Sequence, residues 1–321
     1  MIIRNGKEFI TMAEERIYDM IIIGGGPAGY TAALYASRAG FDTLVIEKMT
    51  AGGQMATTDI IDNYPGFPDG IDGFELGMKM QAGAERFGAV TEYGNVTDVE
   101  LSERIKTVTT DFGVYKSKTV VIATGAAPRE LGIPKEKDFL GMGIHYCAHC
   151  DGRFYKGKRV IVVGGGNSAA ADALYLSNLA ERVTVVHRRD TLRATKIYHE
   201  PLMRATNVEF LWNSEVVGIL GEERVNGAVI RSKTDGKEME IMCDAIFVSI
   251  GREPETGFSL GDIERDNAGY IIANETTRTN IDGVYAIGDV RAKPLRQVVT
   301  AVADGAVAVH FAEEYLAEYR E

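Results

Sequence analysis

Cysteine is scarce in this sequence: only Cys147, Cys150 and Cys243 occur among 321 residues. So small and odd a number excludes a protein held together by a framework of disulfides. Two of the three form a C-x-x-C pair, a spacing that indicates either redox chemistry or a metal site. Cys243 lies in the apolar run 240–250, and we expect it to be a small buried side chain within a strand.

Long apolar runs and an excess of positive charge are also missing. No run approaches the ~20 consecutive apolar residues of a membrane span, and residues 1–16 lack the apolar stretch of a secretory signal. Lys and Arg number 35 against 46 Asp and Glu, which gives a net charge of −11. Nucleic acids and anionic membranes bind clustered cations. We therefore expect a cytoplasmic protein with neither kind of partner.

Glycine, by contrast, is plentiful, with 36 residues, many of them in short clusters. Two clusters belong to an internal repeat: residues 21–47 align without a gap to residues 161–187, and each copy carries a G-G-G triplet at the same place. In both copies an apolar run precedes the glycines, an Ala- and Leu-rich segment follows, and a second apolar run ends the unit. This order predicts a strand, a helix and a second strand, a βαβ unit that is present twice.

Both glycine clusters fit the G-x-G-x-x-G/A pattern of dinucleotide-binding units, with the strand before and the helix after that the pattern requires. The glycines allow a tight turn, and the amides at the helix N-terminus favour an anionic pyrophosphate. We therefore predict two dinucleotide sites. The alternative is that the glycines merely let each helix pack closely on its strand.

The two copies differ in the residue that ends their second strand. The first ends in Glu47, placed to accept hydrogen bonds from ribose hydroxyls, whereas the second runs into His187, Arg188 and Arg189, with Arg193 following. A carboxylate repels a 2′-phosphate and arginines bind one. The first site therefore suits FAD or NAD and the second suits NADPH, unless the arginines are only a solvated charge run.

Two apolar segments that end at a glycine, 120–126 and 246–252, flank the second copy. We interpret them as crossings between domains, so the predicted fold is α/β, with two Rossmann-like dinucleotide-binding domains and the second inserted within the first. The predicted boundaries are 1–125 for the FAD domain with an N-terminal extension 1–17, 126–251 for the NADPH domain, and 252–321 for the rest of the FAD domain. A strand over 284–290 would place Asp289 near the first cofactor, ahead of an apolar helix over 296–315.

The C-x-x-C pair lies inside the predicted inserted domain and allows three interpretations. As a redox pair, one thiolate attacks a substrate disulfide, the other resolves the mixed disulfide, and the adjacent Asp151 gives and takes the proton. As a metal site, the pair with His145 or His149 supplies the ligands, although structural zinc usually draws on a second, distant pair. The third interpretation is a pair of unreactive core cysteines.

Taken together, the motifs resemble those of low-molecular-weight thioredoxin reductases. Nine short motifs occur in the family's order: GGGPAG (24–29), GGQ (52–54), NYPG (63–66), ATG (123–125), YCAHCDG (146–152), GGGNSA (164–169), HRRDTLRA (187–194), AIGDV (286–290) and RQ (296–297). The resemblance covers nearly the whole chain from Tyr18. It implies a flavoprotein disulfide oxidoreductase that oxidises NADPH.

The resemblance also assigns residues to the two cofactors. For FAD it implies Gly24, Gly26, Pro27, Ala28, Glu47, Lys48, Gly53, Gln54, Asn63, Asp289, Arg296 and Gln297. For NADPH it implies Gly164, Gly166, Asn167, Ser168, Ala169, His187, Arg188, Arg189 and Arg193.

For the dithiol, the resemblance implies that Cys150 faces the flavin, Cys147 attacks the disulfide of thioredoxin and Asp151 donates the proton. It further implies a homodimer, and a nucleotide domain that rotates at hinges near residues 126 and 251.

Two residues depart from the family pattern. Ala171 stands where a carboxylate is usual, although Asp172 is retained, and this bears on how NADPH is oriented. His149 stands where Thr is common, and an imidazolium there would stabilise the Cys147 thiolate and make the pair easier to reduce.

Several alternatives share part of this pattern. The same FAD and dithiol chemistry can be fed by ferredoxin or another donor, but such relatives tend to lose the arginine cluster. The acceptor can be another small dithiol protein. The flavoprotein arm of a peroxide-reducing system also resembles this sequence. It carries an additional thioredoxin-like region at its N-terminus, and we expect the short segment before Tyr18 to leave no room for one. A regulatory module that binds flavin or zinc is the non-enzymatic alternative.

Overall fold

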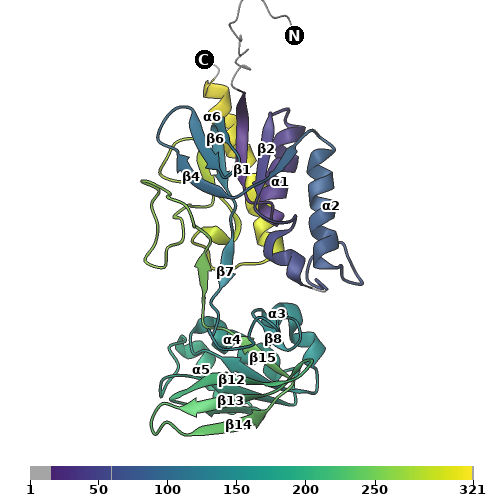
Figure 1. Ribbon diagram of the computed structural model, residues 1–321, viewed down its shortest axis with the longest axis vertical. Coiled ribbons are helices and arrows are strands. Elements are labelled where there is room, and N and C mark those ends of the chain that lie inside the picture. The colour runs from purple at the N-terminus through teal and green to yellow at the C-terminus, as the bar shows by residue number, and fades with distance from the viewer. Residues whose placement is uncertain (1–15, 59, 320–321) are drawn as a thin grey trace, which may run out of the picture. The chain divides into compact units, whose positions relative to one another are not determined.

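The computed structural model describes residues 16–58 and 60–319, and Figure 1 shows the order of the elements. The predicted N-terminal extension, 1–17, lies outside the described residues except for its last two. The chain divides into two compact units. Within the described residues, the first unit comprises 16–56, 74–125 and 254–319, and the second comprises 57–73 and 126–253.

The first unit is built on a seven-stranded sheet with the order β3-β2-β1-β6-β5-β4, with β17 paired to β6. The pairs among β3, β2, β1, β6 and β17 are parallel, and those among β6, β5 and β4 are antiparallel. The strands are β1 (Ile17–Ile23), β2 (Thr43–Glu47), β3 (Val90–Tyr93), β4 (Val96–Glu100), β5 (Lys106–Thr110), β6 (Val114–Ile122) and β17 (Val284–Ala286).

The central parallel strands of this sheet, such as β1, are apolar on both faces because each face has its own core. Met20 and Ile22 of β1 belong to the cluster on one face, and Ile21 and Ile23 belong to the cluster on the other. This explains why the sequence reads as a continuous apolar run there rather than as an alternating one. A strand of this kind has no solvent face.

Helices α1 (Pro27–Arg38), α2 (Gly73–Glu85) and α6 (Val298–Tyr319) complete the first unit, together with the 3-10 turns η1 (Gly53–Thr57) and η3 (Gly288–Val290). Pro27 occupies the first turn of α1, where its missing N–H costs nothing. The alanine-rich face of α1 packs closely against α6: a Cβ atom on Gly305 would lie 2.5 Å from the carbonyl oxygen of Ala28. Small residues thus hold α1 between the sheet and α6.

The second unit contains a parallel sheet with the order β11-β10-β9-β15-β8 and an antiparallel sheet with the order β12-β13-β14. The parallel strands are β8 (Ile144–His145), β9 (Arg159–Val163), β10 (Arg182–Val186), β11 (Val208–Leu211) and β15 (Ala245–Val248). The antiparallel strands are β12 (Ser214–Gly221), β13 (Val225–Ser232) and β14 (Glu238–Met242). Helices α3 (Ala148–Asp151), α4 (Asn167–Ser177) and α5 (Lys196–Arg204) and the 3-10 turn η2 (Gly152–Tyr155) complete the unit.

The two predicted βαβ units are confirmed. β1, α1 and β2 form the first, and β9, α4 and β10 form the second, with parallel pairing of the strands in each. The α/β fold is likewise confirmed. The chain leaves the first unit after residue 125 and returns to it at residue 254. On the way it forms the paired strands β7 (Ala126–Pro128) and β16 (Arg252–Pro254).

Three elements differ from their predicted bounds. The run 240–250 is two strands, because β14 ends at Met242 and the chain turns at Cys243 into β15 of the other sheet. The predicted strand 284–290 is only three residues long before the turn η3 begins at Gly288, whose φ of +69° suits glycine. The C-terminal helix starts at Val298, so residues 296 and 297 precede it. Cys243 itself is buried as predicted.

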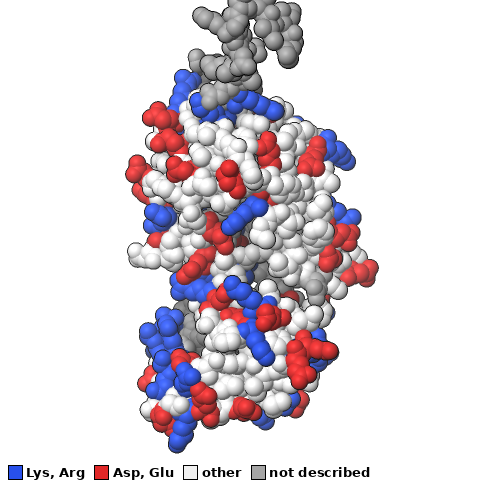
Figure 2. Space-filling model, viewed as in Figure 1, with Lys and Arg blue, Asp and Glu red and all other residues white. Residues whose placement is uncertain are grey.

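Acidic and basic side chains are interspersed over the face of the molecule that Figure 2 displays. No helix among the described residues is both long and apolar enough to cross a membrane.

Candidate functional site

The glycine turn of the first unit joins β1 to α1. Gly24 has a φ of +106°, and a Cβ atom there would lie 2.5 Å from the carbonyl oxygen of Ala123. A Cβ on Gly29 would lie 1.9 Å from the carbonyl oxygen of Gly24, so the helix can approach the strand only because that residue is glycine. A Cβ on Gly26 would meet nothing within 4 Å. The turn is therefore tight on its protein side and open at Gly26, the side from which a pyrophosphate approaches such a turn.

Several other predicted residues of the first unit gather at this turn. A Cβ on Gly53 would lie 3.5 Å from the Cα of Gly26, and a Cβ on Gly288 would lie 3.0 Å from the Cβ of Ala28. The backbone amide of Gly52 donates to the carbonyl of Gly25 at 2.8 Å. Turn η1, which carries Gln54, and turn η3, which carries Asp289, are thereby both brought to the start of α1.

Glu47 lies at the end of β2, beside the same turn, and is buried. Its carboxylate accepts hydrogen bonds from the backbone amides of Gly25 at 2.6 Å and Met49 at 2.9 Å. Each carboxylate oxygen has a second lone pair, which a ribose hydroxyl can use. The exposed Lys48 follows it directly.

Arg296 and Gln297 lie just before α6 and are half-buried. The guanidinium of Arg296 donates to the carbonyl of Asp289 at 3.3 Å and stacks over the ring of Tyr270, with the guanidinium carbon 4.0 Å from its centroid. Asn63 falls in the segment 57–73, which groups with the second unit. Eleven of the twelve predicted FAD residues therefore lie within one unit, and Asn63 belongs to the other.

Thr124 is a residue of this region that was not among the predicted site residues. Its hydroxyl is buried and has no hydrogen-bond partner among the described residues, and its Cα would lie 3.2 Å from a Cβ on Gly24. A buried hydroxyl without a partner is costly unless a ligand or water satisfies it. The signal in the sequence was the ATG motif, in which the threonine is the only side chain with a polar group.

The glycine turn of the second unit repeats the geometry of the first. Gly164 has a φ of +144°, and a Cβ there would lie 2.4 Å from the carbonyl oxygen of Ser249, whereas a Cβ on Gly166 would meet nothing within 4 Å. Asn167, Ser168 and Ala169 form the first turn of α4, whose N-cap Gly166 supplies no side-chain cap.

The loop after β10 folds back over this second turn. The backbone amide of Arg193 donates to the carbonyl of Gly165 at 2.7 Å, and that of Thr195 donates to the side chain of Asn167 at 2.8 Å. Arg188, Arg189 and Arg193 are exposed, and none of their guanidinium groups forms an ion pair with another described residue. All nine predicted NADPH residues thus lie around one turn.

His187 is the buried member of this group. Its ring lies against Gly165, and its Nε2 has no hydrogen-bond partner among the described residues. Burial lowers the pKa of His187, and the positive charges of Arg193, Arg188 and Arg189 lower it further. The ring is therefore neutral at pH 7, and the positive charge around this turn comes from the arginines.

The dithiol lies in the second unit, after the edge strand β8: Cys147 immediately precedes α3 and Cys150 lies within it. Cys147 and Cys150 form a disulfide, with their Cα atoms 5.3 Å apart. Cys147 caps α3, and the backbone amide of Cys150 donates to its Sγ at 3.2 Å. An amide donor of this kind stabilises a thiolate when the pair is reduced. β8 and β9 both run parallel to β15, so their carboxyl ends lie at the same edge of the sheet. The dithiol follows β8 and the second glycine turn follows β9, so both lie at that edge.

Asp151 ends α3 and is held by a buried neighbour. Its Oδ2 lies 3.0 Å from Nδ1 of His145, and Nε2 of His145 lies 2.8 Å from the hydroxyl of Tyr155. The sequence presented His145 only as a possible metal ligand. Among the described residues, no group of three or more His, Cys, Asp or Glu side chains is placed to hold a metal ion.

The two departures from the family pattern lie close to the dithiol. The exposed ring of His149 stacks on Tyr175 of α4, with centroids 4.3 Å apart. Asp172, one position after Ala171, accepts a hydrogen bond from Ser249 at 2.5 Å, and burial raises the pKa of its carboxyl. His149 lowers that pKa through its charge, so the two side chains are close enough to interact.

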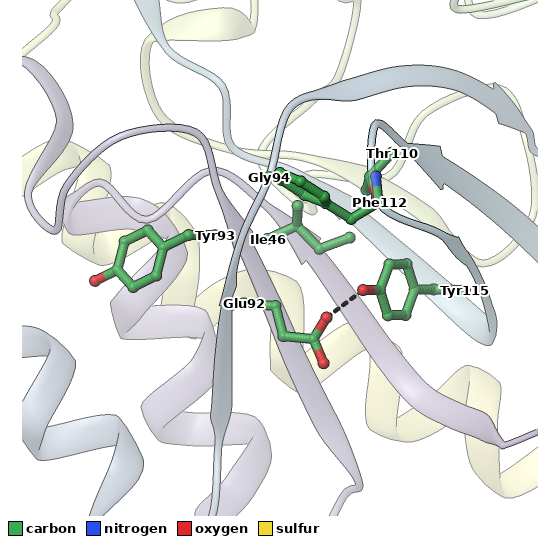
Figure 3. A pocket seen from close by; sticks show the side chains of 7 residues that line it. All are labelled: Ile46, Glu92, Tyr93, Gly94, Thr110, Phe112 and Tyr115. Atoms are coloured by element: carbon green, nitrogen blue, oxygen red, sulfur yellow. Dashed lines mark hydrogen bonds between the residues drawn. The ribbon is translucent and has the colours of Figure 1, made fainter.

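A cavity of about 170 Å³ in the first unit lies apart from these residues (Figure 3). It is lined by Ile46, Glu92, Tyr93, Gly94, Thr110, Phe112 and Tyr115, and the hydroxyl of Tyr115 donates to Glu92. None of the predicted site residues lines it. Ile46 and Glu47 are neighbours on β2 and face opposite sides of the sheet, so this cavity is not the dinucleotide site.

Comparison with known proteins gives a consistent result. Residues 18–305 match the family model of pyridine nucleotide-disulphide oxidoreductases. A thioredoxin reductase of Listeria monocytogenes is 47% identical over 310 residues, 96% of this chain and 97% of its own. The crystal structure of thioredoxin reductase from Streptococcus pyogenes is 44% identical with a TM-score of 0.87, over 94% of this chain and 99% of that one.

A more distant solved structure is a ferredoxin-flavin thioredoxin reductase from Clostridium acetobutylicum. It is 31% identical with a TM-score of 0.50, over 95% of this chain and 99% of that one.

Proposed function

Because this chain belongs to the pyridine nucleotide-disulphide oxidoreductase family, we propose that it is a thioredoxin-disulfide reductase. The family implies FAD and NADPH as cofactors and disulfide oxidoreduction as the chemistry. The observation that carries the proposal is the Cys147–Cys150 disulfide with Asp151 beside it, in a unit that also has an open dinucleotide turn. Thioredoxin is the substrate, with another small dithiol protein as the alternative acceptor.

Bound FAD supplies the two-electron step between NADPH and the disulfide. The residues proposed to hold it are those gathered at Gly26, and the open space there and the buried hydroxyl of Thr124 both fit a ligand at that place. Glu47 would accept hydrogen bonds from the ribose. The turn η3 would direct Asp289 toward the same ligand.

In the proposed exchange, the Cys147 thiolate attacks one sulfur of the substrate disulfide and a mixed disulfide forms. Cys150 then attacks Cys147, the second substrate thiolate leaves, and the intramolecular disulfide is restored. The amide of Cys150 supports the first thiolate. Asp151 gives its proton to the sulfur that would otherwise leave as a thiolate.

NADPH is proposed to bind at the second glycine turn, with its 2′-phosphate among Arg188, Arg189 and Arg193. Support comes from three guanidinium groups without carboxylate partners among the described residues, beside a turn that is open at Gly166. Unpaired arginines of this kind are suited to bind a phosphate through paired N–H groups. If the three arginines were only a solvated charge run, nothing would require them to lie beside a dinucleotide turn.

We further propose a cytoplasmic homodimer. The buried thiol of Cys243 suits a compartment that keeps thiols reduced. Exposed apolar side chains on the first unit, among them Phe74 and Met78 one turn apart on α2, would supply part of a subunit contact. Light scattering at micromolar concentration tests the dimer, because a monomer mass would exclude it.

A ferredoxin-fed enzyme is the second candidate, on the strength of the likeness to the Clostridium acetobutylicum protein. The arginines argue for NADPH instead. An anaerobic titration with NADPH separates the two: we expect the flavin absorbance to bleach at low NADPH and to recover on addition of oxidised thioredoxin. Bleaching by reduced ferredoxin alone would overturn the assignment of the donor and of the arginines.

A further inference from the structure

A chain of three buried or half-buried side chains leads away from the dithiol. Asp151 contacts Nδ1 of His145 at 3.0 Å, and Nε2 of His145 contacts the hydroxyl of Tyr155 at 2.8 Å. His145 is 7% exposed and Tyr155 is 8% exposed, whereas the carboxylate end of the chain is the most exposed, with 19% of the Asp151 side chain accessible. All three belong to the segment β8-α3-η2 that carries the cysteines.

The imidazole of His145 is held in place by two aromatic rings, one from β15 and one from η2. His145 pairs with Phe247 of β15 in the sheet register, and the two rings stack with centroids 5.3 Å apart. Tyr155 meets both rings edge-on. The ring of His145 therefore has one orientation, with its two nitrogens directed at the carboxylate and at the phenol.

Charged groups face two members of this hydrogen-bonded series. Asp151 faces His145 directly, and Tyr155 is the next group along. Arg224, Asp244 and the ammonium of Lys158, which lies 5.7 Å from the ring centroid, face Tyr155. Burial raises the pKa of Tyr155 to about 12, so its hydroxyl keeps its hydrogen at neutral pH and can donate it or turn it aside.

An acid that works in each turnover exists in two protonation states, and a buried partner must satisfy both. When Asp151 is ionised, Nδ1–H of His145 donates to it and the hydroxyl of Tyr155 donates to Nε2. When Asp151 holds its proton, it donates to Nδ1, and Nε2–H donates to the oxygen of Tyr155. A lysine or arginine partner has no acceptor and suits only the first state, whereas imidazole and phenol suit both by a change of tautomer and a turn of the hydroxyl.

We propose that His145 is a positioning residue for Asp151 and that Tyr155 keeps Nε2 of His145 hydrogen-bonded in either tautomer, so that the acid beside the dithiol stays hydrogen-bonded before and after it gives up its proton. In that step the proton of the Asp151 carboxyl bonds to the thiolate sulfur. The His145 ring changes tautomer by exchange with water, with one proton leaving Nε2 and one arriving at Nδ1, and a further proton from water later restores the carboxyl. No electron moves in any of these steps. The inference rests on the proposed function, because it is Asp151 that serves the dithiol.

The test compares four variants of the holoprotein: His145→Phe, His145→Asn, Tyr155→Phe and Asp151→Asn. The first keeps a ring to stack on Phe247 but has no nitrogen. His145→Asn is the conservative variant, because its amide reaches toward Asp151 and can donate or accept. Tyr155→Phe removes one hydroxyl and leaves the packing intact. Thermal unfolding of each variant shows that it is folded.

Two pH profiles are recorded for each variant. The first is the rate at which iodoacetamide alkylates Cys147 in protein reduced by dithiothreitol, which needs neither NADPH nor thioredoxin. The second is turnover with NADPH and thioredoxin. Loss of one hydrogen bond to an ionising pair corresponds to a shift of about 0.5–1 pH unit in a midpoint.

We expect His145→Phe to lower turnover and to move a midpoint of its pH profile by about 0.5–1 pH unit, because the acid beside the dithiol loses its imidazole partner. It should also move the midpoint of alkylation. Tyr155→Phe should shift both in the same direction by less, and His145→Asn should restore most of the wild-type profile. Unchanged midpoints in both His145→Phe and Tyr155→Phe would overturn the proposal, even if the melting temperature fell. His145 and Tyr155 would then contribute only to packing.

Failure of the proposed function has a different signature. If wild-type protein does not turn over with NADPH, or if Asp151→Asn leaves turnover unchanged, the function or the role of Asp151 is wrong. The alkylation profile still reports in that case whether His145 and Tyr155 act on the dithiol.

Discussion

Single residues decide the chemistry at both turns and at the dithiol, and the sequence allowed many of them to be named. Gly24 and Gly164 were predicted from the glycine pattern alone, and the structure gives both the positive φ and the close approach to a carbonyl that require glycine. His145 and Thr124 could not be assigned, since their roles depend on neighbours that lie far away in the chain: Phe247 stacks on the first, and the Gly24 turn lies beside the second. Sequence alone shows that such residues are polar and does not show what they face.

His149 is the residue whose departure from the family has a measurable consequence. Replacing it by threonine removes a positive charge that the ring can carry next to the cysteines, so the thiolate is less favoured and the disulfide harder to reduce. We expect His149→Thr to lower the reduction potential by about 10–30 mV, measured in a glutathione-buffered titration.

The matched control is His310→Thr, which removes an exposed imidazole from the first unit. It should leave the potential unchanged. Equal potentials for wild type and His149→Thr would show that His149 has no part in the redox poise.

Arg188 and Arg189 should distinguish the two nicotinamide cofactors. Because they face the 2′-phosphate in the proposed complex, their joint replacement by alanine removes charge-assisted hydrogen bonds that NADH never makes. We expect KM for NADPH to rise ~10- to 100-fold with little change for NADH, in steady-state kinetics.

Arg204→Ala, an exposed arginine of α5 in the same unit, controls for the loss of positive charge in general. A rise in KM that is the same for both cofactors would remove the arginines from the phosphate site.

At the scale of elements, the apolar runs and glycine clusters predicted the two βαβ units because their period and spacing are local properties. The run 240–250 misled the prediction, since two strands of different sheets can follow each other without a long polar segment between them. The strand predicted over 284–290, ending in Gly288 and Asp289, is shorter for a different reason: β17 ends at Ala286, and Gly288, with its positive φ, begins the turn η3. Local composition does not reveal which sheet a strand joins.

The contact between α1 and α6 depends on Gly305. A Cβ there would lie 2.5 Å from the carbonyl of Ala28 and 2.9 Å from the amide of Ala32, and both are backbone atoms that cannot turn aside. We expect Gly305→Ala to lower the free energy of unfolding by about 1–3 kcal/mol, measured by urea denaturation.

Gly83→Ala on α2 is the comparison, because a Cβ there meets nothing within 4 Å. It should raise the free energy of unfolding by up to about 1 kcal/mol through helix propensity. If both changes destabilise equally, the close contact of α6 with α1 is not what matters.

At the scale of the whole molecule, two apolar segments that flank the second glycine cluster predicted the insertion of one domain in another, and the chain divides into its two compact units at residues 125 and 254 near them. The grouping of residues 57–73 with the second unit was not predicted, because nothing in their composition marks a boundary. A buried charge cluster also escaped prediction. Asp304 of α6 receives hydrogen bonds from Arg291 at 2.9 Å and Lys293 at 2.8 Å.

This cluster makes the stability of the protein depend on pH. Burial opposes ionisation of Asp304, but the hydrogen bonds and charges of Arg291 and Lys293 outweigh it and lower the pKa of its carboxyl. A carboxyl whose pKa is lower in the folded state stabilises the protein above its unfolded pKa, and that stability is lost as pH falls. The loss should begin below about pH 5.

Asp304→Asn should therefore cost about 3–5 kcal/mol at pH 7, because two cations are left without their carboxylate. It should also flatten the decline in stability between about pH 5 and pH 2. Glu313→Gln, an exposed change on the same helix, should do neither. A variant with the wild-type pH slope would show that Asp304 does not carry the effect.

The insertion also fixes an order of events during translation. Residues 126–253 leave the ribosome as a nearly complete unit while the first unit still lacks β17 and α6, the strand that pairs with β6 and the helix that covers α1. At ~5–20 residues per second, the missing part follows on the order of a few seconds later. During that interval β1, α1 and β6 expose apolar surface, because β17 and α6, which cover it in the folded protein, have not yet been made. The second unit can therefore fold while the first unit is still incomplete. The exposed apolar surface of the first unit is where a chaperone would bind the nascent chain.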